Sequence, residues 1–132
     1  MARLSYVNVF AADIVALSQF YMDVFGFPEI EAIRSPIFRG IDAGSCCIGF
    51  NAHDAYDLLK LDAYRNARGV KFLLNIDVED MAAVERVTER AVSLGAALIK
   101  APYRTYYNWY QSVLLDPEQN VFRVNHMLPA GV

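Results

Sequence analysis

The sequence contains very few cysteines and histidines. Its only cysteines, Cys46 and Cys47, are adjacent. Neighbouring side chains of a strand point to opposite faces, so a disulfide between these two would be strained. The pair also lacks the spacing of a cysteine-bound zinc site. We therefore expect a reducing compartment and no structural metal held by cysteine.

The chain also lacks a long apolar run, a signal-peptide layout and an excess of positive charge. No uninterrupted apolar stretch approaches the roughly 20 residues that a membrane-spanning helix needs. The N-terminal MARLSYVN does not have the arrangement of a signal peptide. The formal net charge is -3, which is not typical of a nucleic-acid-binding protein. We predict a cytoplasmic protein with neither nucleic acid nor membrane as a partner.

No glycine- and serine-rich linker and no low-complexity segment divides the chain. Its 132 residues are 55% hydrophobic, which is enough to form a buried core. We predict a single domain over residues 1–132.

A repeated pattern does run through this domain. Asp13 is a good helix N-cap, and apolar residues follow it at helical spacing as far as Gly26. Asp80 begins a second pattern of the same kind, which ends at Gly95. Each helix is therefore predicted to start at an aspartate and to stop at a glycine.

An apolar strand with an asparagine in it precedes each predicted helix. The first is YVNVFAAD with Asn8, and the second is LLNIDVED with Asn75. The separation from Asn8 to Asn75 equals that from Asp13 to Asp80, so the two halves are copies of one unit. Short strands are predicted after each helix, at 29–34, 37–42 and 45–51, and again at 97–101, 109–115 and 121–127.

The predicted fold is therefore α+β, with two tandem βαβββ modules. Module 1 covers about residues 1–52, a connector about 53–69, and module 2 about 70–132. The connector is either a loop or a short helix with Tyr56, Leu59 and Ala63 facing inward.

Alternation along the strands separates an apolar phase from a mixed phase. The mixed phase contains Tyr6, Asn8, Phe10, Cys47, Gly49, Asn51, Leu73, Asn75, Asp77, Arg123 and Asn125. Such a face is either open to solvent or the wall of a partly wet pocket. The nearby segment APYRTYYNWYQ is rich in tyrosine and tryptophan, which is typical of a ligand pocket and equally of a dimer interface.

Two segments carry a resemblance to a known family. VNVFAADIVALSQFYMDVFGF and LLDPEQNVFRVNH resemble the opening and the final hairpin of the vicinal-oxygen-chelate superfamily, which includes glyoxalase I, bleomycin-resistance proteins and extradiol dioxygenases. The resemblance implies that the mixed sheets of the two modules curl around a shared cavity. It also implies four metal ligands in metal-using members, at positions that here carry Tyr6, Gly49, Leu73 and Arg123. Because these are not a credible ligand set, we expect no metal and no cofactor.

His53 and His126 are the only histidines, and a single histidine is more often structural than metal-binding. The resemblance then implies binding of a small aromatic or acidic molecule in the cavity between the modules, as in resistance-type sequestration. The alternatives are a lyase, isomerase or dioxygenase acting on a small metabolite, and a protein-interaction module. We also expect a homodimer, as in many two-module members.

Candidate residues follow from the mixed phase and the aromatic segment. The predicted ligand-binding residues are Tyr6, Asn8, Cys47, Asn75, Tyr107, Trp109, Tyr110 and Arg123. The candidate catalytic groups of the enzyme alternative are Tyr6, Asp77 and Arg123, with Cys47 as a further acid or base on the same phase.

Overall fold

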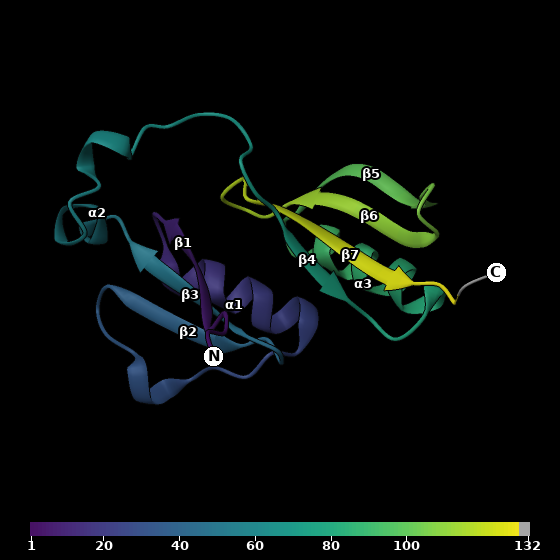
Figure 1. Ribbon diagram of the computed structural model, residues 1–132, viewed down its shortest axis with the longest axis horizontal. Helices are drawn as coiled ribbons and strands as arrows, with labels where there is room; N and C mark the ends of the chain where they lie inside the picture. Colours follow the sequence, from purple (N-terminus) through teal and green to yellow (C-terminus); the bar gives the residue numbers. More distant parts are fainter. Residues whose placement is uncertain (130–132) are drawn as a thin grey trace. The chain divides into compact units, whose positions relative to one another are not determined.

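The computed structural model describes residues 1–129. The chain divides into two compact units, Met1–Arg68 and Gly69–Val132. Each unit is a mixed β-sheet with one long helix packed against one of its faces (Figure 1). The predicted α+β architecture of two βαβββ-like modules is confirmed, and each unit is described here by itself.

The first unit has a three-stranded sheet in the order β1-β3-β2. Its β1 runs parallel to β3, and β2 runs antiparallel to β3. Its elements are β1 (Tyr6–Ala11), α1 (Ile14–Phe25), η1 (Glu31–Ile33), β2 (Phe38–Asp42), β3 (Cys47–Ala52), α2 (Asp54–Leu58) and η2 (Asp62–Tyr64).

The second unit has a four-stranded sheet in the order β4-β7-β6-β5. Its β4 is parallel to β7, and the pairs β6–β7 and β5–β6 are antiparallel. Its elements are β4 (Leu74–Asp77), α3 (Met81–Ser93), β5 (Ala97–Arg104), β6 (Trp109–Leu115) and β7 (Val121–Met127).

Both long helices begin and end as the repeat predicts. The Asp13 carboxylate accepts a hydrogen bond from the Ala16 N–H at 2.9 Å, and the Asp80 carboxylate accepts one from the Ala83 N–H at 2.7 Å. Each bond satisfies an N–H that the first turn leaves without a helical partner. Gly26, with φ of 77°, takes the left-handed conformation that ends α1.

The apolar stripe of α1 packs on the first sheet. Leu17 and Tyr21 are almost wholly buried, and the Tyr21 ring lies 5.7 Å from the ring of Phe50 on β3. This contact identifies the helix-covered face of the first sheet as the one that carries Ile48 and Phe50. The same division holds in the second sheet, where Phe122 and Val124 are fully buried.

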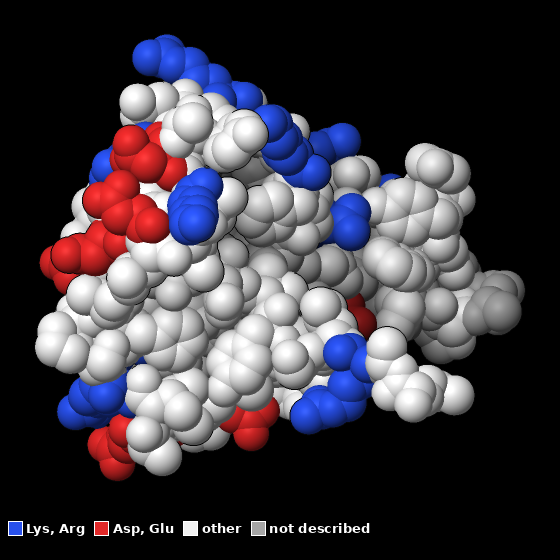
Figure 2. All heavy atoms as spheres, turned by 60° about the vertical axis from the view of Figure 1, so that its left-hand side comes forward, with Lys and Arg blue, Asp and Glu red and all other residues white. Residues whose placement is uncertain are grey.

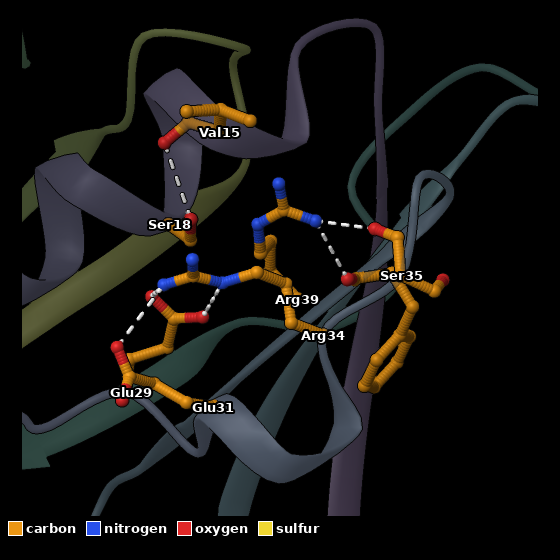
Figure 3. A network of polar contacts seen from close by, with 8 residues as sticks. Val15, Ser18, Glu29, Glu31, Arg34, Ser35 and Arg39 are labelled. Atoms are coloured by element: carbon orange, nitrogen blue, oxygen red, sulfur yellow. Dashed lines mark hydrogen bonds and ion pairs between the residues drawn. The ribbon is translucent and has the colours of Figure 1, made fainter.

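The prediction of a strand over residues 29–34 is wrong. Only Glu29 pairs with the sheet, as an isolated bridge to Ile41, and residues 31–33 form the 3₁₀ helix η1. The guanidinium of Arg34 binds the Glu29 carboxylate through two hydrogen bonds of 2.7 Å (Figure 3). Such a bidentate pair closes the segment on itself and lowers the pKa of Glu29. This local ion pair takes the place of a continuous ladder.

The connector contains a short helix, and of the three side chains predicted to face inward only Tyr56 packs against the rest of the unit. The Tyr56 ring stacks on Phe10 at 4.1 Å, and the Arg65 guanidinium lies 5.1 Å from the centre of the same ring. Leu59 is 56% exposed and Ala63 is also exposed, so the prediction for these two residues is wrong. One aromatic stack and one cation–π contact hold the segment, rather than a continuous apolar face.

Charged residues of both signs occur on the surface. Figure 2 shows acidic and basic side chains on the visible face, with uncharged residues between them, in keeping with the formal net charge of -3. None of the helices within residues 1–129 combines the length and apolarity that a membrane span requires.

Candidate functional site

The face of the second sheet that points away from α3 carries several polar side chains. On β6, the Tyr110 hydroxyl donates a hydrogen bond to the Glu85 carboxylate of α3, and the Ser112 hydroxyl lies 2.7 Å from that of Thr88. Tyr110 and Ser112 therefore face the helix. Because side chains alternate along a strand, Gln111 between them points to the opposite face.

Six polar residues from four strands meet on this opposite face. We call them the polar face; they are Asn75, Asp77, Tyr103, Gln111, Arg123 and Asn125. The register aligns Asp77 with Asn125, Asn125 with Gln111, and Gln111 with Tyr103. These four side chains form one row that crosses the whole sheet.

Both buried amides form hydrogen bonds within the row, and the Asp77 carboxylate fixes the direction of the Asn125 amide because an ionised carboxylate only accepts. The Asp77 Oδ1 atom accepts from the Asn125 Nδ2 atom at 2.9 Å and from the Asn75 Nδ2 atom at 3.1 Å. The Gln111 Nε2 atom donates to the Tyr103 hydroxyl at 3.4 Å. The two amide nitrogens are thus drawn toward opposite edges of the sheet, Asn125 toward β4 and Gln111 toward β5.

Three buried polar atoms of this face lack a hydrogen-bond partner within residues 1–129. They are the Gln111 Oε1, Asn125 Oδ1 and Arg123 Nε atoms. Gln111 is 2% exposed and Asn125 is fully buried. A buried polar group without a partner costs about 1–3 kcal/mol, so three on one face are unusual in a surface whose only role is structural.

An aromatic pair borders the polar face. The Arg123 Nη1 atom donates to the Tyr107 hydroxyl at 3.3 Å, and the Tyr107 ring meets the Trp109 ring edge to face at 5.1 Å. Tyr107 is 38% exposed. Arginine and tyrosine thus connect the buried amides to an accessible aromatic surface.

Tyr110 lies apart from the other predicted ligand-binding residues of this unit. Its hydroxyl faces α3, and the hydrogen bond to Glu85 raises the pKa of Tyr110, with burial adding to the effect. A raised pKa in the folded state stabilises the protein fully below the pKa of an unfolded tyrosine, about 10, and this contribution disappears as the pH rises above that value.

The stability of the wild-type protein should therefore fall between pH 10 and pH 11 by more than that of Tyr110→Phe. Urea unfolding at each pH measures the difference. The exposed Tyr64→Phe is the control and should follow the wild type. Parallel curves for wild type and Tyr110→Phe would show that Tyr110 titrates normally.

The other predicted site residues lie on the first unit. Tyr6, Asn8 and Cys47 occupy the face of its sheet away from α1, with Tyr6 paired in register with Cys47. Burial raises the pKa of Tyr6, and a hydrogen bond with the Cys47 thiol contributes to the same shift. The Asn8 side chain lies over Gly49, where an added Cβ would come within 2.0 Å of the Asn8 Oδ1 atom.

The structure thus separates the predicted site residues into two groups. Asn75, Asp77, Tyr107, Trp109 and Arg123 belong to the second unit, with Tyr6, Asn8 and Cys47 on the first. The prediction of site residues omitted Tyr103, Gln111 and Asn125. Tyr103 and Gln111 both belong to the aromatic segment APYRTYYNWYQ, which could have identified them. Their pairing could not be predicted, because β5 shifts register between Lys100 and Tyr103.

Comparison with known proteins identifies the family. The model of the Glyoxalase/Bleomycin resistance protein/Dioxygenase superfamily matches residues 3–124. The chain belongs to this superfamily.

Solved structures similar to this chain include a near relative and several distant ones. A glyoxalase/bleomycin resistance protein/dioxygenase family enzyme from Burkholderia phytofirmans PsJN is 62% identical, with a TM-score of 0.94 over 96% of this chain and 100% of that one. A glyoxalase-related enzyme from Fulvimarina pelagi is 16% identical, with a TM-score of 0.78 over 96% and 88%. A lactoylglutathione lyase from Agrobacterium tumefaciens is 19% identical, with a TM-score of 0.69 over 96% and 94%. The last two share the fold alone. No curated protein matches the sequence.

The positions that the superfamily resemblance assigns to metal ligands do not fit a divalent cation here. Gly49 has no side-chain donor, and Asn8 and Phe38 fill the space beside it, since a Cβ there would lie 2.8 Å from the Phe38 ring. Leu73 has no donor, and Arg123 carries a permanent positive charge. Within residues 1–129, His, Cys, Asp and Glu side chains do not gather in threes as a metal-binding group.

Proposed function

We propose that this superfamily member binds a small aromatic or acidic molecule on the polar face without a metal ion, as a sequestering protein of the resistance type. The observation that carries the proposal is the set of three buried, unpartnered polar atoms of Gln111, Asn125 and Arg123 beside the Tyr107–Trp109 pair. A bound molecule would supply the missing hydrogen bonds and cover the aromatic surface.

The two parts of the face suit different parts of a ligand. An aromatic ring that packs against Tyr107 or Trp109 gains about 0.5–1.5 kcal/mol per contact beyond the burial of its area. The guanidinium of Arg123 suits an acidic group, because hydrogen bonds between ionised partners are about twice as strong as neutral ones. The Tyr107 hydroxyl already orients one end of that guanidinium.

Arg123→Ala should weaken the binding of benzoate by about tenfold more than that of benzyl alcohol, because only benzoate loses a charge-assisted hydrogen bond, worth about 1.5–3 kcal/mol. Isothermal titration of the wild type and the variant gives both affinities. Arg86→Ala is the matched control, since Arg86 lies on α3, where it pairs with Glu79 at 2.9 Å. Unchanged relative affinities in Arg123→Ala would remove Arg123 from the site.

The enzyme alternative gains support from the geometry of Asp77. Two amides, Asn75 and Asn125, donate to the same oxygen of its exposed carboxylate and hold it in place on the polar face. An oriented carboxylate of this kind can act as a general base in a lyase or isomerase. If the bound molecule is converted, as followed by NMR, Asp77→Asn should retain binding and lose turnover.

The remaining expectations stay predictions: a homodimer, a cytoplasmic location, no cofactor, and neither nucleic acid nor membrane as a partner. Size-exclusion chromatography with light scattering tests the first of them.

A further inference from the structure

The three side chains that carry the unpartnered atoms project from neighbouring positions of the sheet. Gln111 and Asn125 are direct partners across β6 and β7, and Arg123 lies two residues before Asn125 on the same strand. Opposed Cβ atoms lie about 4.5–5.5 Å apart, and alternate residues of a strand about 6.6 Å apart. The three groups therefore converge on one small part of the polar face.

The orientation of the two amides determines what they can bind. Their nitrogens are drawn to opposite edges of the sheet by Asp77 and Tyr103. Their carbonyl oxygens point away from these partners, and neither oxygen accepts a hydrogen bond within residues 1–129. A group that reaches the three unpartnered atoms needs two hydrogen-bond donors for the oxygens and one acceptor for the Arg123 Nε–H.

We propose that the ligand carries a primary carboxamide that binds at the Gln111 Oε1, Asn125 Oδ1 and Arg123 Nε atoms. This inference rests on the proposed function and narrows its ligand class. The NH₂ of a carboxamide donates to both oxygens, and its carbonyl oxygen accepts from the arginine. The count of donors and acceptors matches that of the three atoms.

Other head groups match less well. A carboxylate satisfies Arg123, but its oxygens then face the oxygens of Gln111 and Asn125, so that like partial charges meet in a buried place. A hydroxyl has a single donor and leaves one of the two amide oxygens without a partner. A flat carboxamide joined to a ring also extends from the buried amides to the Tyr107–Trp109 pair that borders them.

Benzamide, benzoate and benzyl alcohol are the probes, because they share one ring and differ in the head group. Isothermal titration of the full chain should give an affinity for benzamide at least about tenfold higher than for benzoate, since a site with unpaired polar atoms discriminates strongly against a mismatched analogue. A crystal structure with benzamide should place its nitrogen within hydrogen-bond distance of both amide oxygens.

Two variants test whether Gln111 and Asn125 are responsible for the preference for benzamide. Gln111→Met keeps the length of the side chain and removes one acceptor, so benzamide should bind about two- to tenfold more weakly while benzoate is unaffected or improved. Asn125→Leu should do the same and is an independent check if one variant folds poorly. Ser112→Ala is the control, because Ser112 lies between Gln111 and Val113 on β6 but faces α3; it should leave both affinities unchanged.

The outcomes separate this inference from the proposed function. Benzoate bound as tightly as benzamide, or benzamide insensitive to both Gln111→Met and Asn125→Leu, overturns the carboxamide assignment and leaves small-molecule binding in place. A water molecule held by the three atoms while benzamide binds elsewhere also overturns it. If the protein binds none of the three probes and no other small aromatic or acidic molecule, both proposals fail.

Discussion

Asn125→Leu should make the protein more stable by about 1–3 kcal/mol, although it removes a polar residue from the middle of a sheet. Asn125 is fully buried, and its Oδ1 atom is without a hydrogen-bond partner within residues 1–129. Leucine removes that cost, buries apolar surface, and sacrifices one hydrogen bond to the exposed Asp77. A gain in stability that comes with a loss of ligand binding is typical of a functional residue.

Urea unfolding followed by tryptophan fluorescence measures this change. Trp109 is the only tryptophan and lies on β6, in the same sheet as Asn125, so its signal reports on the second unit. Ser112→Ala is the matched control. It leaves the Thr88 hydroxyl buried without its partner and should cost about 1–3 kcal/mol. If Asn125→Leu destabilises the protein as Ser112→Ala does, Asn125 is structural and the site loses its main support.

Phe50→Ala should lower the stability of the first unit by about 3–5 kcal/mol, the usual cost when a buried phenylalanine is truncated and leaves a cavity. Phe50 is fully buried on the central strand β3, and its ring packs against that of Tyr21 on α1. The variant removes the main aromatic contact between the helix and the sheet.

Hydrogen exchange by mass spectrometry localises this loss, since the amides of β1, β3 and α1 should exchange faster. Val15→Ala is the control on the same helix. Val15 is 55% exposed, so its truncation should change the stability by no more than about 0.5 kcal/mol. Equal protection of β3 in Phe50→Ala and in the wild type would contradict a core centred on the Phe50–Tyr21 contact.

The helices and most strands could be predicted because their signals are local. An aspartate cap needs only the N–H three residues further on, and a glycine stop needs only its own backbone conformation. Strand alternation likewise depends on neighbours in the sequence. The segment after α1 was wrongly predicted because the hydrogen bonds between Arg34 and Glu29 depend on side-chain geometry that periodicity does not describe.

The candidate site could be predicted only in part, for a similar reason. The phase of each strand gave Asn75, Asp77 and Arg123, but nothing in the sequence shows which polar side chains find a partner. The isolation of the Gln111 and Asn125 oxygens depends on contacts with Tyr103 and Asp77 on other strands. The contact with Tyr103 also depends on a register shift in β5, which no sequence pattern marks.

The register of the two sheets constrains how the duplicated halves could have diverged. Gly49 stands opposite Asn8 on the first sheet as Arg123 stands opposite Asn75 on the second. Codons for glycine and arginine can differ by a single base, so one mutation can in principle exchange these two residues. In the first half, however, the Asn8 side chain and the Phe38 ring occupy the space that a new Cβ would need, so both must shift to admit one. An evolutionary path that places an arginine at position 49 must therefore also move or replace Asn8 and Phe38, so substitutions at these three positions are coupled rather than independent.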